Sequence, residues 1–370
     1  MIDTVGEVRE AVERGYTLPA EWYSSPAVYA LERERIFART WQYAGRSELV
    51  AEPGQYMASY AGHIPVVVAR DQEGVLNAFV NVCRHRGTEV ASGCGRRETL
   101  QCPYHAWTYG LDGSLRAAPR SEREPGFDKA EWGLFPVRAD TWGPFVFVNP
   151  DVGAEPLADS LGELPGLVAE SGLDLGELRF RGHADWQINV NWKIGIENYL
   201  ECYHCPVAHP SFSKLYDVDP DAYILRSYPT FSSQFGPVRE SALSGNGRGV
   251  PYVPRGEVKQ AQYHLLWPNT TINIEAGRAN LSIDSWIPAG PQHTAGRSDY
   301  FFAEDVPEET VHEMVAFGQQ VAAEDKALVE AVQRGLNSNT VLHGRLLLNS
   351  EHLIQHFQRL VVGTLAETES

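Results

Sequence analysis

Three residues of metal-binding type lie close together in the stretch Asn191–His209: Glu201, His204 and His209. Glu201 and His204 are three residues apart, so on a helix they share one face. Pro206 lies between the two histidines and disfavours a regular helix there, so the chain is expected to bend and bring His209 towards His204. Two imidazoles aimed at one point suit iron(II) or zinc. The alternative is a pair of ordinary polar histidines in an aromatic-rich helix.

A third ligand is predicted on a long helix from about Glu308 to Leu336. Asp325 lies on one face of this helix by the 3.6-residue period, together with Val321, Leu328, Val329, Val332 and Leu336. A carboxylate on an apolar face is costly unless it binds a cation or a donor. With two histidines it completes the two-His-one-carboxylate triad, which leaves positions at iron(II) open for oxygen and substrate. The alternatives are Glu324 as the ligand, or a buried salt bridge from Asp325 to Arg334 or Arg345.

Two mixed cysteine–histidine pairs precede this region, Cys83 with His85 in VCRHRG and Cys102 with His105 in CPYHAW. Each pair follows a strand-like run and precedes turn residues, so both are predicted at the tips of neighbouring hairpins. Four such ligands hold either a tetrahedral zinc or a two-iron cluster. One cysteine and one histidine from each loop is the order expected when both cysteines bind one iron and both histidines the other, as in a Rieske centre. Cys94, between the pairs, is interpreted as a surface thiol.

The elements that must position these residues predict an α+β fold. Residues 1–42 have helical periodicity, 43–150 contain short strand-like runs separated by turn residues, and 151–176 read as a connection with a short helix. The clearest predicted strands are 64–70, 76–82, 143–150, 271–276 and 281–288, and the clearest helices are 308–336 and 351–362.

Length and composition restrict the class of protein to which the chain can belong. A chain of 370 residues is long for one core and predicts two domains. The net charge of −17 argues against nucleic acid and anionic membranes as partners. Five cysteines are too few and too irregular for a disulfide scaffold. No signal-like or membrane-spanning apolar run is present, so we expect a cytoplasmic protein.

These motifs together make the chain resemble the large (alpha) subunit of a Rieske non-haem iron oxygenase. The likeness extends over nearly all of the chain, from WYSSPAVYALERERIFARTWQYAG through both cysteine–histidine motifs and NWKIGIENYLECYHC to EDKALVEAVQRGL. With Glu201 in NYLECYHC, the chain is more similar to the carnitine- and glycine-betaine-type monooxygenases than to the ring-dihydroxylating dioxygenases, which typically carry Asp there.

The resemblance implies an architecture and a set of partners. A small antiparallel β Rieske domain is expected over 43–150 and a helix-grip, START-like catalytic domain with an antiparallel sheet over 151–370, with residues 1–42 packed on the latter. The subunits are expected to form a head-to-tail homotrimer. Electrons from NAD(P)H would arrive through a separate flavin or iron–sulfur reductase or a ferredoxin, and O2 would be the co-substrate.

The resemblance also implies roles for single residues. Cys83, His85, Cys102 and His105 would hold the [2Fe–2S] cluster, and His204, His209 and Asp325, at the family's third-ligand position, the mononuclear iron(II). Glu201 would bond His204 with one oxygen, direct the other outward, and carry electrons from a cluster histidine of the next subunit, His85 or His105. Asn198 and Tyr203 lie close by in the sequence and are candidates to orient the iron ligands.

The same resemblance favours a small quaternary ammonium or N-methyl substrate that is hydroxylated or demethylated. Such a cation would lie over aromatic ring faces, and Trp267 and Trp286 on predicted strands could line the pocket or belong to the core. The alternative is ring hydroxylation of an aromatic acid, which needs an arginine clamp such as Arg226, Arg278 or Arg345. Two alternative functions come from other classes of protein: a zinc-stabilised, non-catalytic binding protein and a Rieske electron carrier without an oxygenase site.

Overall fold

The computed structural model describes residues 5–244 and 249–366, and the chain divides into two compact units. The larger unit comprises the residues up to Ile36 and those from Ser160 onward, and the smaller unit is Phe37–Asp159. The expected boundaries after residues 42 and 150 therefore lie elsewhere. The flanking segments belong to the smaller unit because Phe37 O accepts from Gln42 Nε2 at 2.7 Å and Glu155 O from Trp41 Nε1 at 2.9 Å.

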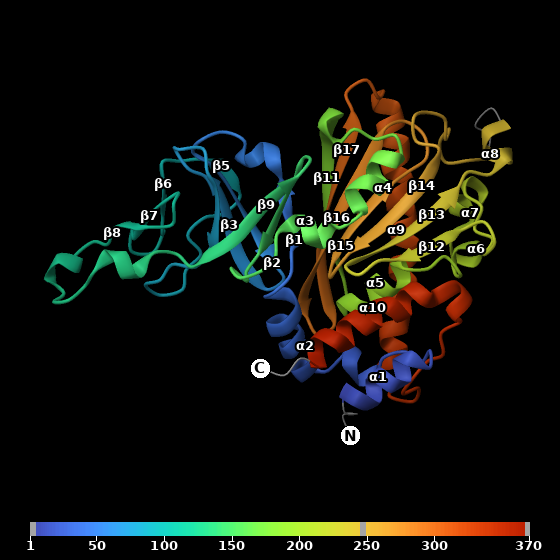
Figure 1. Cartoon of the computed structure of the whole chain (residues 1–370), viewed down its shortest axis with the longest axis horizontal. Helices are drawn as coiled ribbons and strands as arrows, with labels where there is room; N and C mark the ends of the chain where they lie inside the picture. Colours follow the sequence, from blue (N-terminus) through green and yellow to red (C-terminus); the bar gives the residue numbers. More distant parts are fainter. Residues whose placement is uncertain (1–4, 245–248, 367–370) are drawn as a thin grey trace. The chain divides into compact units, whose positions relative to one another are not determined.

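The larger unit is built on a seven-stranded antiparallel sheet (Figure 1) with the order β11-β17-β16-β15-β14-β13-β12. Its strands are β11 (Leu178–Ile188), β12 (Ile224–Ser227), β13 (Phe231–Pro237), β14 (Gln260–Leu266), β15 (Thr270–Ile274), β16 (Asn280–Gly290) and β17 (His293–Ala303). The side chains alternate along each strand, so residues two apart face the same side.

The helices of the larger unit include the long predicted one, α9 (Glu308–Leu336), with the expected bounds. It contacts β11 and also α5, and a long helix against an antiparallel sheet is the helix-grip arrangement. The helices are α1 (Val5–Glu13), α2 (Pro26–Glu32), α4 (Leu164–Glu170), α5 (Trp192–Tyr199), α6 (Cys205–Ala208), α7 (Pro210–Leu215), α8 (Glu240–Ser244), α9 and α10 (Leu348–Ala366).

The smaller unit contains a second seven-stranded antiparallel sheet, β1-β10-β9-β4-β3-β2-β5, and a three-stranded sheet, β6-β7-β8. Its strands are β1 (Gln42–Arg46), β2 (Gln55–Ala61), β3 (Ile64–Arg70), β4 (Leu76–Val80), β5 (Cys94–Arg96), β6 (Thr99–Gln101), β7 (Thr108–Gly110), β8 (Leu115–Ala117), β9 (Pro136–Trp142) and β10 (Phe145–Asn149). α3 (Leu157–Leu161) follows at the unit boundary. The α+β class and the antiparallel character predicted from the sequence are confirmed.

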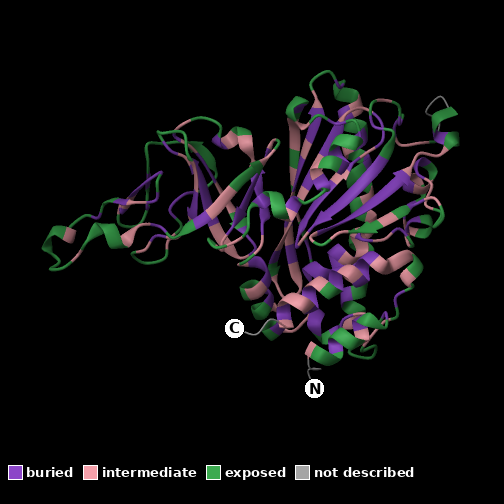
Figure 2. Cartoon of the chain, viewed as in Figure 1, coloured by how far each residue is buried: buried purple, intermediate pink, exposed green. Residues whose placement is uncertain are grey.

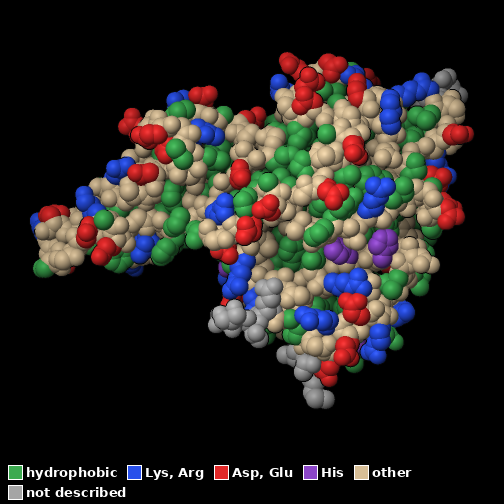
Figure 3. Space-filling view, in the orientation of Figure 1, with side chains coloured by type: hydrophobic (Ala, Val, Ile, Leu, Met, Phe, Trp, Pro, Cys, Tyr) green, Lys and Arg blue, Asp and Glu red, His purple; other side chains and the backbone are tan. Residues whose placement is uncertain are grey.

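Burial follows the expected pattern within each unit. Figure 2 shows long buried stretches along the strands of the large sheet, whereas the helices keep exposed outer faces. On the face seen in Figure 3, acidic side chains are scattered among lysines and arginines. Across the described residues, no helix is both long and apolar enough to cross a membrane.

A buried carboxyl group joins the N-terminal segment to α5 and α10 within the larger unit. Tyr23, in the first 42 residues, donates its hydroxyl to Oε1 and Oε2 of Glu197 on α5 at 2.8 and 3.0 Å, and Gln358 on α10 donates Nε2 to Oε1 at 2.9 Å. Burial raises the pKa of Glu197 to about 7, although the hydrogen bonds from Gln358 and Tyr23 and the charge of Lys193 oppose this shift.

Replacing Glu197 with glutamine is therefore expected to stabilise the protein at alkaline pH. The folded carboxyl holds its proton more tightly than the unfolded one, so wild-type stability falls as the pH rises from about 4.5 to about 7, by on the order of 3 kcal/mol. E197Q has no such loss, so its Tm should exceed that of the wild type at pH 8 and the gain should shrink at pH 5. Y23F, which removes a hydroxyl donor and leaves the carboxyl, should be destabilised at both values. A gain in E197Q that is equal at pH 5 and pH 8 would contradict this assignment.

Candidate functional site

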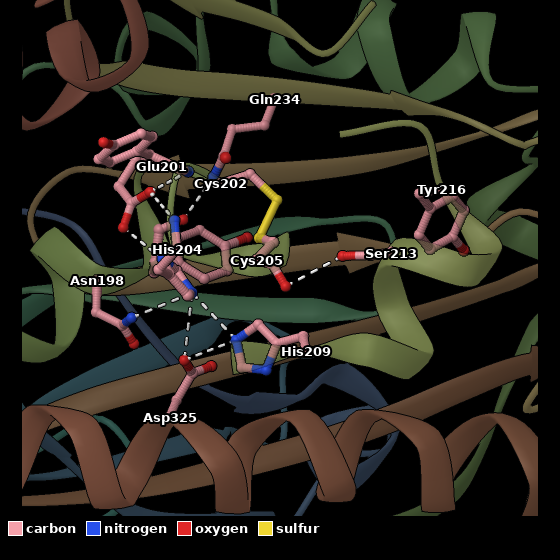
Figure 4. The surroundings of a disulfide bond; sticks show 12 residues. Asn198, Glu201, Cys202, His204, Cys205, His209, Ser213, Tyr216, Gln234 and Asp325 are labelled. Atoms are coloured by element: carbon pink, nitrogen blue, oxygen red, sulfur yellow. Dashed lines mark hydrogen bonds and ion pairs between the residues drawn. A yellow bond between two sulfur atoms is a disulfide. The ribbon is translucent and has the colours of Figure 1, made fainter. Parts of the chain in front are cut away.

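Three metal-binding side chains of the larger unit converge on one point (Figure 4). Nε2 of His209 lies 3.0 Å from Nε2 of His204 and 3.0 Å from Oδ1 of Asp325, and Nε2 of His204 lies 3.4 Å from the same oxygen. Ligand atoms about 2.1 Å from a shared ion and roughly at right angles are about 3 Å apart. The three atoms therefore fit one face of an iron(II) ion, the arrangement of the two-His-one-carboxylate triad.

Glu201 and His204 do not lie on the helix expected from the sequence. α5 ends at Tyr199, and His204 lies in a turn before α6. Pro206 and Pro210 occupy the first turns of α6 and α7, where the missing N–H has no intrahelical partner to lose. Pro206 thus begins a helix rather than interrupting one, and the two short helices bring His209 back to His204.

The neighbouring carboxylates control the protonation of the two histidines. Burial lowers the pKa of His204, but the hydrogen bonds and charges of Asp325 and Glu201 outweigh it and raise this pKa to about 9. Burial raises the pKa of Asp325, but both histidines oppose it, and the result lies below the ordinary value. Because a metal ligand must be a neutral imidazole, His204 gives up a proton when the site is loaded.

Glu201 is turned inward and holds the His204 turn together. Its Oε1 contacts Nδ1 of His204, and its Oε2 accepts from the backbone N–H groups of Tyr203 and, at 3.1 Å, His204. The expected outward-pointing second oxygen is not seen, because the N–H groups of a non-helical turn need an acceptor. By accepting from Nδ1–H, Glu201 fixes the tautomer of His204 in which Nε2 faces the metal site.

Glu324 has a role that the sequence did not predict. Its Oε2 lies 2.7 Å from Nδ1 of His209, and its Oε1 accepts from Gln320 Nε2 at 2.9 Å. Glu324 is thus neither the third ligand nor a free surface group. The feature of the sequence that could have indicated this role is the adjacent pair Glu324–Asp325. Two neighbouring carboxylates on a helix can each contact one ring nitrogen of the same histidine, as they do here with His209.

Glutamine at position 324 is expected to weaken iron binding by about 10- to 100-fold, the range for groups that orient a metal-ligating histidine. The neutral amide is a poorer acceptor for Nδ1–H of His209. The measurement is the iron retained after dialysis against a graded chelator series, with cluster absorbance as a reference. E309Q makes the same charge change at an exposed position of α9 and should behave as wild type. Equal retention in E324Q and E309Q would remove Glu324 from the site.

The apolar face predicted for Asp325 is only partly correct. Val329 is buried, whereas Leu328 and Val332 are 42% and 48% exposed, so Asp325 lies at the edge of the buried face of α9. The alternative salt bridge to Arg345 is wrong, because that guanidinium lies over the ring of Tyr16, 5.2 Å from its centroid.

Asn198 and a disulfide lie next to His204 (Figure 4). Asn198 places Nδ2 3.4 Å from Nε2 of His204, the nitrogen assigned to the metal. Tyr203 is 58% exposed. Cys202 and Cys205 form a disulfide that the sequence did not predict, and it brackets His204 in the chain.

The two cysteine–histidine loops of the smaller unit lie next to each other. Cys83 and Cys102 are buried, whereas His85 and His105 are exposed, with ring centroids 4.6 Å apart. In the first loop the N–H of Cys83 binds Thr88 O at 2.8 Å, and in the second the N–H of Cys102 binds Trp107 O at 2.8 Å. Two inner thiols and two outer imidazoles match a cluster with one iron on cysteines and one on histidines.

Aromatic side chains support this cluster site. His85 stacks on Trp107 with centroids 5.0 Å apart, and the hydroxyl of Tyr109 lies 3.3 Å from Sγ of Cys83. Hydrogen bonds to cluster sulfurs and exposure of the ligands are the features by which proteins set the potential of such centres.

A cavity of about 550 Å³ in the larger unit opens on the iron ligands. Its aromatic lining consists of Trp186, Tyr199, Phe212, Tyr223, Tyr263, Trp286, Tyr300 and Phe317. Its acidic lining consists of Glu201, Glu275, Asp284 and Asp325. Within residues 5–244 and 249–366, no arginine lines it, and its one lysine is Lys326.

Only one of the two tryptophans expected in the pocket is there. Trp286 lines the cavity, but Trp267 packs on Trp192 and Phe357, with centroids 6.4 and 5.7 Å away. The expectation for Trp267 is therefore wrong, because this residue lies in the turn after β14 and its ring packs against α5 and α10. Trp186 on β11, which the sequence did not single out, takes the second position in the cavity wall.

Comparisons with known proteins identify both units. Residues 40–133 match the family described as Rieske [2Fe-2S] domain, and residues 175–367 match Ring hydroxylating alpha subunit (catalytic domain). The chain is 32% identical over 357 residues to the carnitine monooxygenase oxygenase subunit of Acinetobacter pittii, covering 94% of each chain. It is 33% identical over 360 residues to the chloroplastic choline monooxygenase of Spinacia oleracea, covering 95% of this chain and 79% of the relative.

Solved structures give the same result. The quaternary ammonium Rieske monooxygenase CntA, solved with an inhibitor, superposes with a TM-score of 0.85 at 29% identity over 97% of this chain and 98% of that one. Other structures of CntA contain L-carnitine or gamma-butyrobetaine. Matches to both domains exclude the zinc-stabilised binding protein and the electron carrier without an oxygenase site. The chain belongs to the Rieske non-haem iron oxygenases, as an alpha subunit with a [2Fe–2S] cluster and a mononuclear iron.

Proposed function

We propose that the chain is the terminal component of an oxygenase system that uses O2 and reductase-supplied electrons to hydroxylate or demethylate a small quaternary ammonium compound. The observation that carries this proposal is the cavity, which combines aromatic faces with carboxylates and opens on His204, His209 and Asp325. Aromatic faces and anions are the groups that bind an onium ion in a desolvated site. The names of the relatives support the same substrate class.

Two tryptophans form the aromatic corner of this cavity. Trp186 and Trp286 are 4.7 Å apart between ring centroids and inclined by 69°, an edge-to-face arrangement, and both rings line the cavity. Glycines make room for both rings, because a Cβ at Gly296 would lie 2.0 Å from the Trp186 ring and one at Gly195 would lie 2.4 Å from the Trp286 ring. A cation over such a face gains about 0.5–2 kcal/mol.

The side chains around the centres have separate tasks in this proposal. When bound, the cluster and the iron supply one-electron transfer and activation of O2. His204, His209 and Asp325 hold the iron, while Glu201 and Glu324 hold the two imidazoles in orientation. The cavity wall positions a C–H bond and excludes water. Hydroxylation next to the nitrogen gives a carbinolamine, which collapses to an aldehyde and an amine.

We further infer a head-to-tail homotrimer that is served by a separate flavin or iron–sulfur reductase or a ferredoxin. Support comes from exposed side chains at the two surfaces that would meet in such a trimer, one beside Glu201 and one at the cluster histidines. Tyr203 and Val207, beside Glu201, are 58% and 88% exposed, and the cluster histidines His85 and His105 are exposed on their loops. In such a trimer Glu201, which here uses both oxygens within its own turn, would turn one of them to a cluster histidine of the neighbouring subunit.

An aromatic acid is not supported as the substrate, because all three candidate arginines lie away from the cavity. Arg226 is exposed on β12 and lies over the Phe235 ring. Arg278 pairs with Asp305 at 2.7 Å and with Glu257 at 3.4 Å. Arg345 lies over the Tyr16 ring.

A single turnover tests the proposal. The holoenzyme is reduced, mixed with O2 and a panel of quaternary amines and aromatic acids, and the products are identified by mass spectrometry. We expect an aldehyde, with or without a dealkylated amine, from a quaternary amine. A hydroxylated or dihydroxylated ring from an acid, with every quaternary amine unchanged, would overturn the proposal.

A further inference from the structure

Asp284 is the centre of a hydrogen-bonded row across the cavity wall. It lies on β16 directly opposite Thr271 of β15 and Ser298 of β17. Its Oδ2 accepts from Thr271 Oγ1 at 2.9 Å and from Asn273 Nδ2 at 2.8 Å. Burial raises the pKa of this carboxyl group above its usual value, and the neighbouring polar side chains of Ser298, Thr271 and Asn273 oppose the rise.

The same row ties both tryptophans to Asp284. The indole Nε1 of Trp286 donates to Thr271 Oγ1 at 3.1 Å, and that of Trp186 donates to Ser298 Oγ at 3.1 Å. Each hydroxyl accepts from an indole, and that of Thr271 also donates to the carboxylate of Asp284. Asp284 and Trp286 are two residues apart on one strand and face the same side. The carboxylate thus stands beside the aromatic corner and fixes the orientation of its two rings.

A second carboxylate in the cavity wall is already matched by phenol groups. Oε2 of Glu275 accepts from the hydroxyls of Tyr216 at 2.5 Å, Tyr263 at 3.0 Å and Tyr252 at 3.4 Å. It adds negative potential to the cavity, and its hydrogen bonds, like those of Asp284, come from donors within the protein. The one lysine among the described residues of the lining, Lys326, is exposed and donates to Gln187 O at 3.0 Å.

These contacts bear on the net charge of the substrate. A zwitterion would bring a carboxylate into a wall that holds Asp284 and Glu275 and that offers no guanidinium in the described part of the chain. A desolvated carboxylate without a charged donor and near like charges is strongly unfavourable. A cation without a carboxylate would instead be attracted by this wall, which offers two indole rings and the carboxylate of Asp284.

We propose that Asp284 is the charge-recognition residue of the cavity, and that the substrate is a net cation of the trimethylammonium alcohol or amine type rather than a carboxylate-bearing zwitterion. This inference rests on the proposed oxidation of quaternary ammonium compounds and narrows it.

The first experiment needs only the wild-type holoenzyme. Choline and glycine betaine share the trimethylammonium group and differ in an alcohol against a carboxylate. The neutral alcohol 3,3-dimethylbutan-1-ol has the shape of choline without its charge. We expect kcat/KM for choline to exceed that for glycine betaine by at least about 10-fold and that for the neutral alcohol by about 100-fold. Calorimetric Kd values on the oxidised enzyme, where no turnover occurs, should follow the same order.

The second experiment compares two substitutions in the row. D284N removes the charge and keeps the shape, so the ratio of choline to neutral-alcohol binding should fall at least about 10-fold. T271V breaks the link between Trp286 and Asp284 and keeps the charge, so this ratio should change by less than about threefold. A purely structural role of Asp284 would weaken both ligands equally. Iron and cluster contents are measured in each variant.

The results distinguish a preference for a net cation from the oxidation of quaternary ammonium compounds in general. Tighter binding and faster oxidation of glycine betaine, L-carnitine or gamma-butyrobetaine than of choline would overturn the net-cation inference and leave the proposed function intact. Absence of binding and oxidation for every trimethylammonium compound would overturn both. An unchanged ratio in D284N would remove Asp284 from charge recognition. If D284N does not fold, the wild-type series alone decides the charge preference.

Discussion

Replacing Asp325 with alanine is expected to remove the mononuclear iron and lower oxygenase turnover by roughly a thousandfold or more. The substitution leaves two imidazoles without the anionic ligand that lies 3.0 Å from His209 Nε2 and 3.4 Å from His204 Nε2. It also removes a charge that raises the pKa of His204. The histidines are therefore more easily neutral in D325A, so protonation cannot explain the loss. The cluster ligands all lie in the smaller unit and should be unaffected.

The measurement is iron per chain by elemental analysis together with the visible spectrum of the cluster. D325A should hold about two irons per chain, those of the cluster, with an unchanged spectrum. D305N removes a carboxylate outside the cavity, where Asp305 pairs with Arg278, and should retain all of its iron and activity. If D325A kept its mononuclear iron while E324A lost it, the two carboxylates would exchange their assigned roles.

The second large effect is expected from glutamine in place of Glu201, with turnover lowered by about 100-fold while both metal centres stay occupied. The carboxylate serves Nδ1 of His204 with one oxygen and the N–H groups of Tyr203 and His204 with the other. An amide offers one oxygen for these two sets of donors, and its NH2 group faces a donor wherever it points. The ring of His204 is then held less firmly, and the charge beside it is gone.

Two measurements separate the possible roles of Glu201. Iron retention against a chelator reports its hold on His204, and the rate of cluster reoxidation in a single turnover reports electron transfer. An electron bridge predicts slow reoxidation with normal iron retention, whereas a purely positioning role predicts weaker iron retention with normal reoxidation. E309Q controls for the lost charge, and E201D tests the reach of the side chain. Normal coupled turnover in E201Q would exclude Glu201 from both roles.

The sequence by itself determined the features that depend on local order. The long helix α9 and strand β3 have the predicted bounds, because hydrophobic periodicity and turn residues act over a few positions. The cluster ligands were identifiable because each loop carries its cysteine and histidine within four residues. His204 and His209 were identifiable for the same reason, although the fold of the turn between them was not, since Pro206 can end one helix or begin another.

Only the tertiary structure decided how distant positions meet. Helical periodicity favoured Asp325 over Glu324 as the ligand, but the contact of Glu324 with the other ring nitrogen of His209 depends on how α9 packs against the turn that carries His209. Trp186 and Ser298 acquire their roles through the register of β11, β17 and β16, and Trp267 loses its expected role because its ring packs against the helical layer. Such contacts join residues about a hundred positions apart, and pairing register and helix docking, rather than local propensity, determine them.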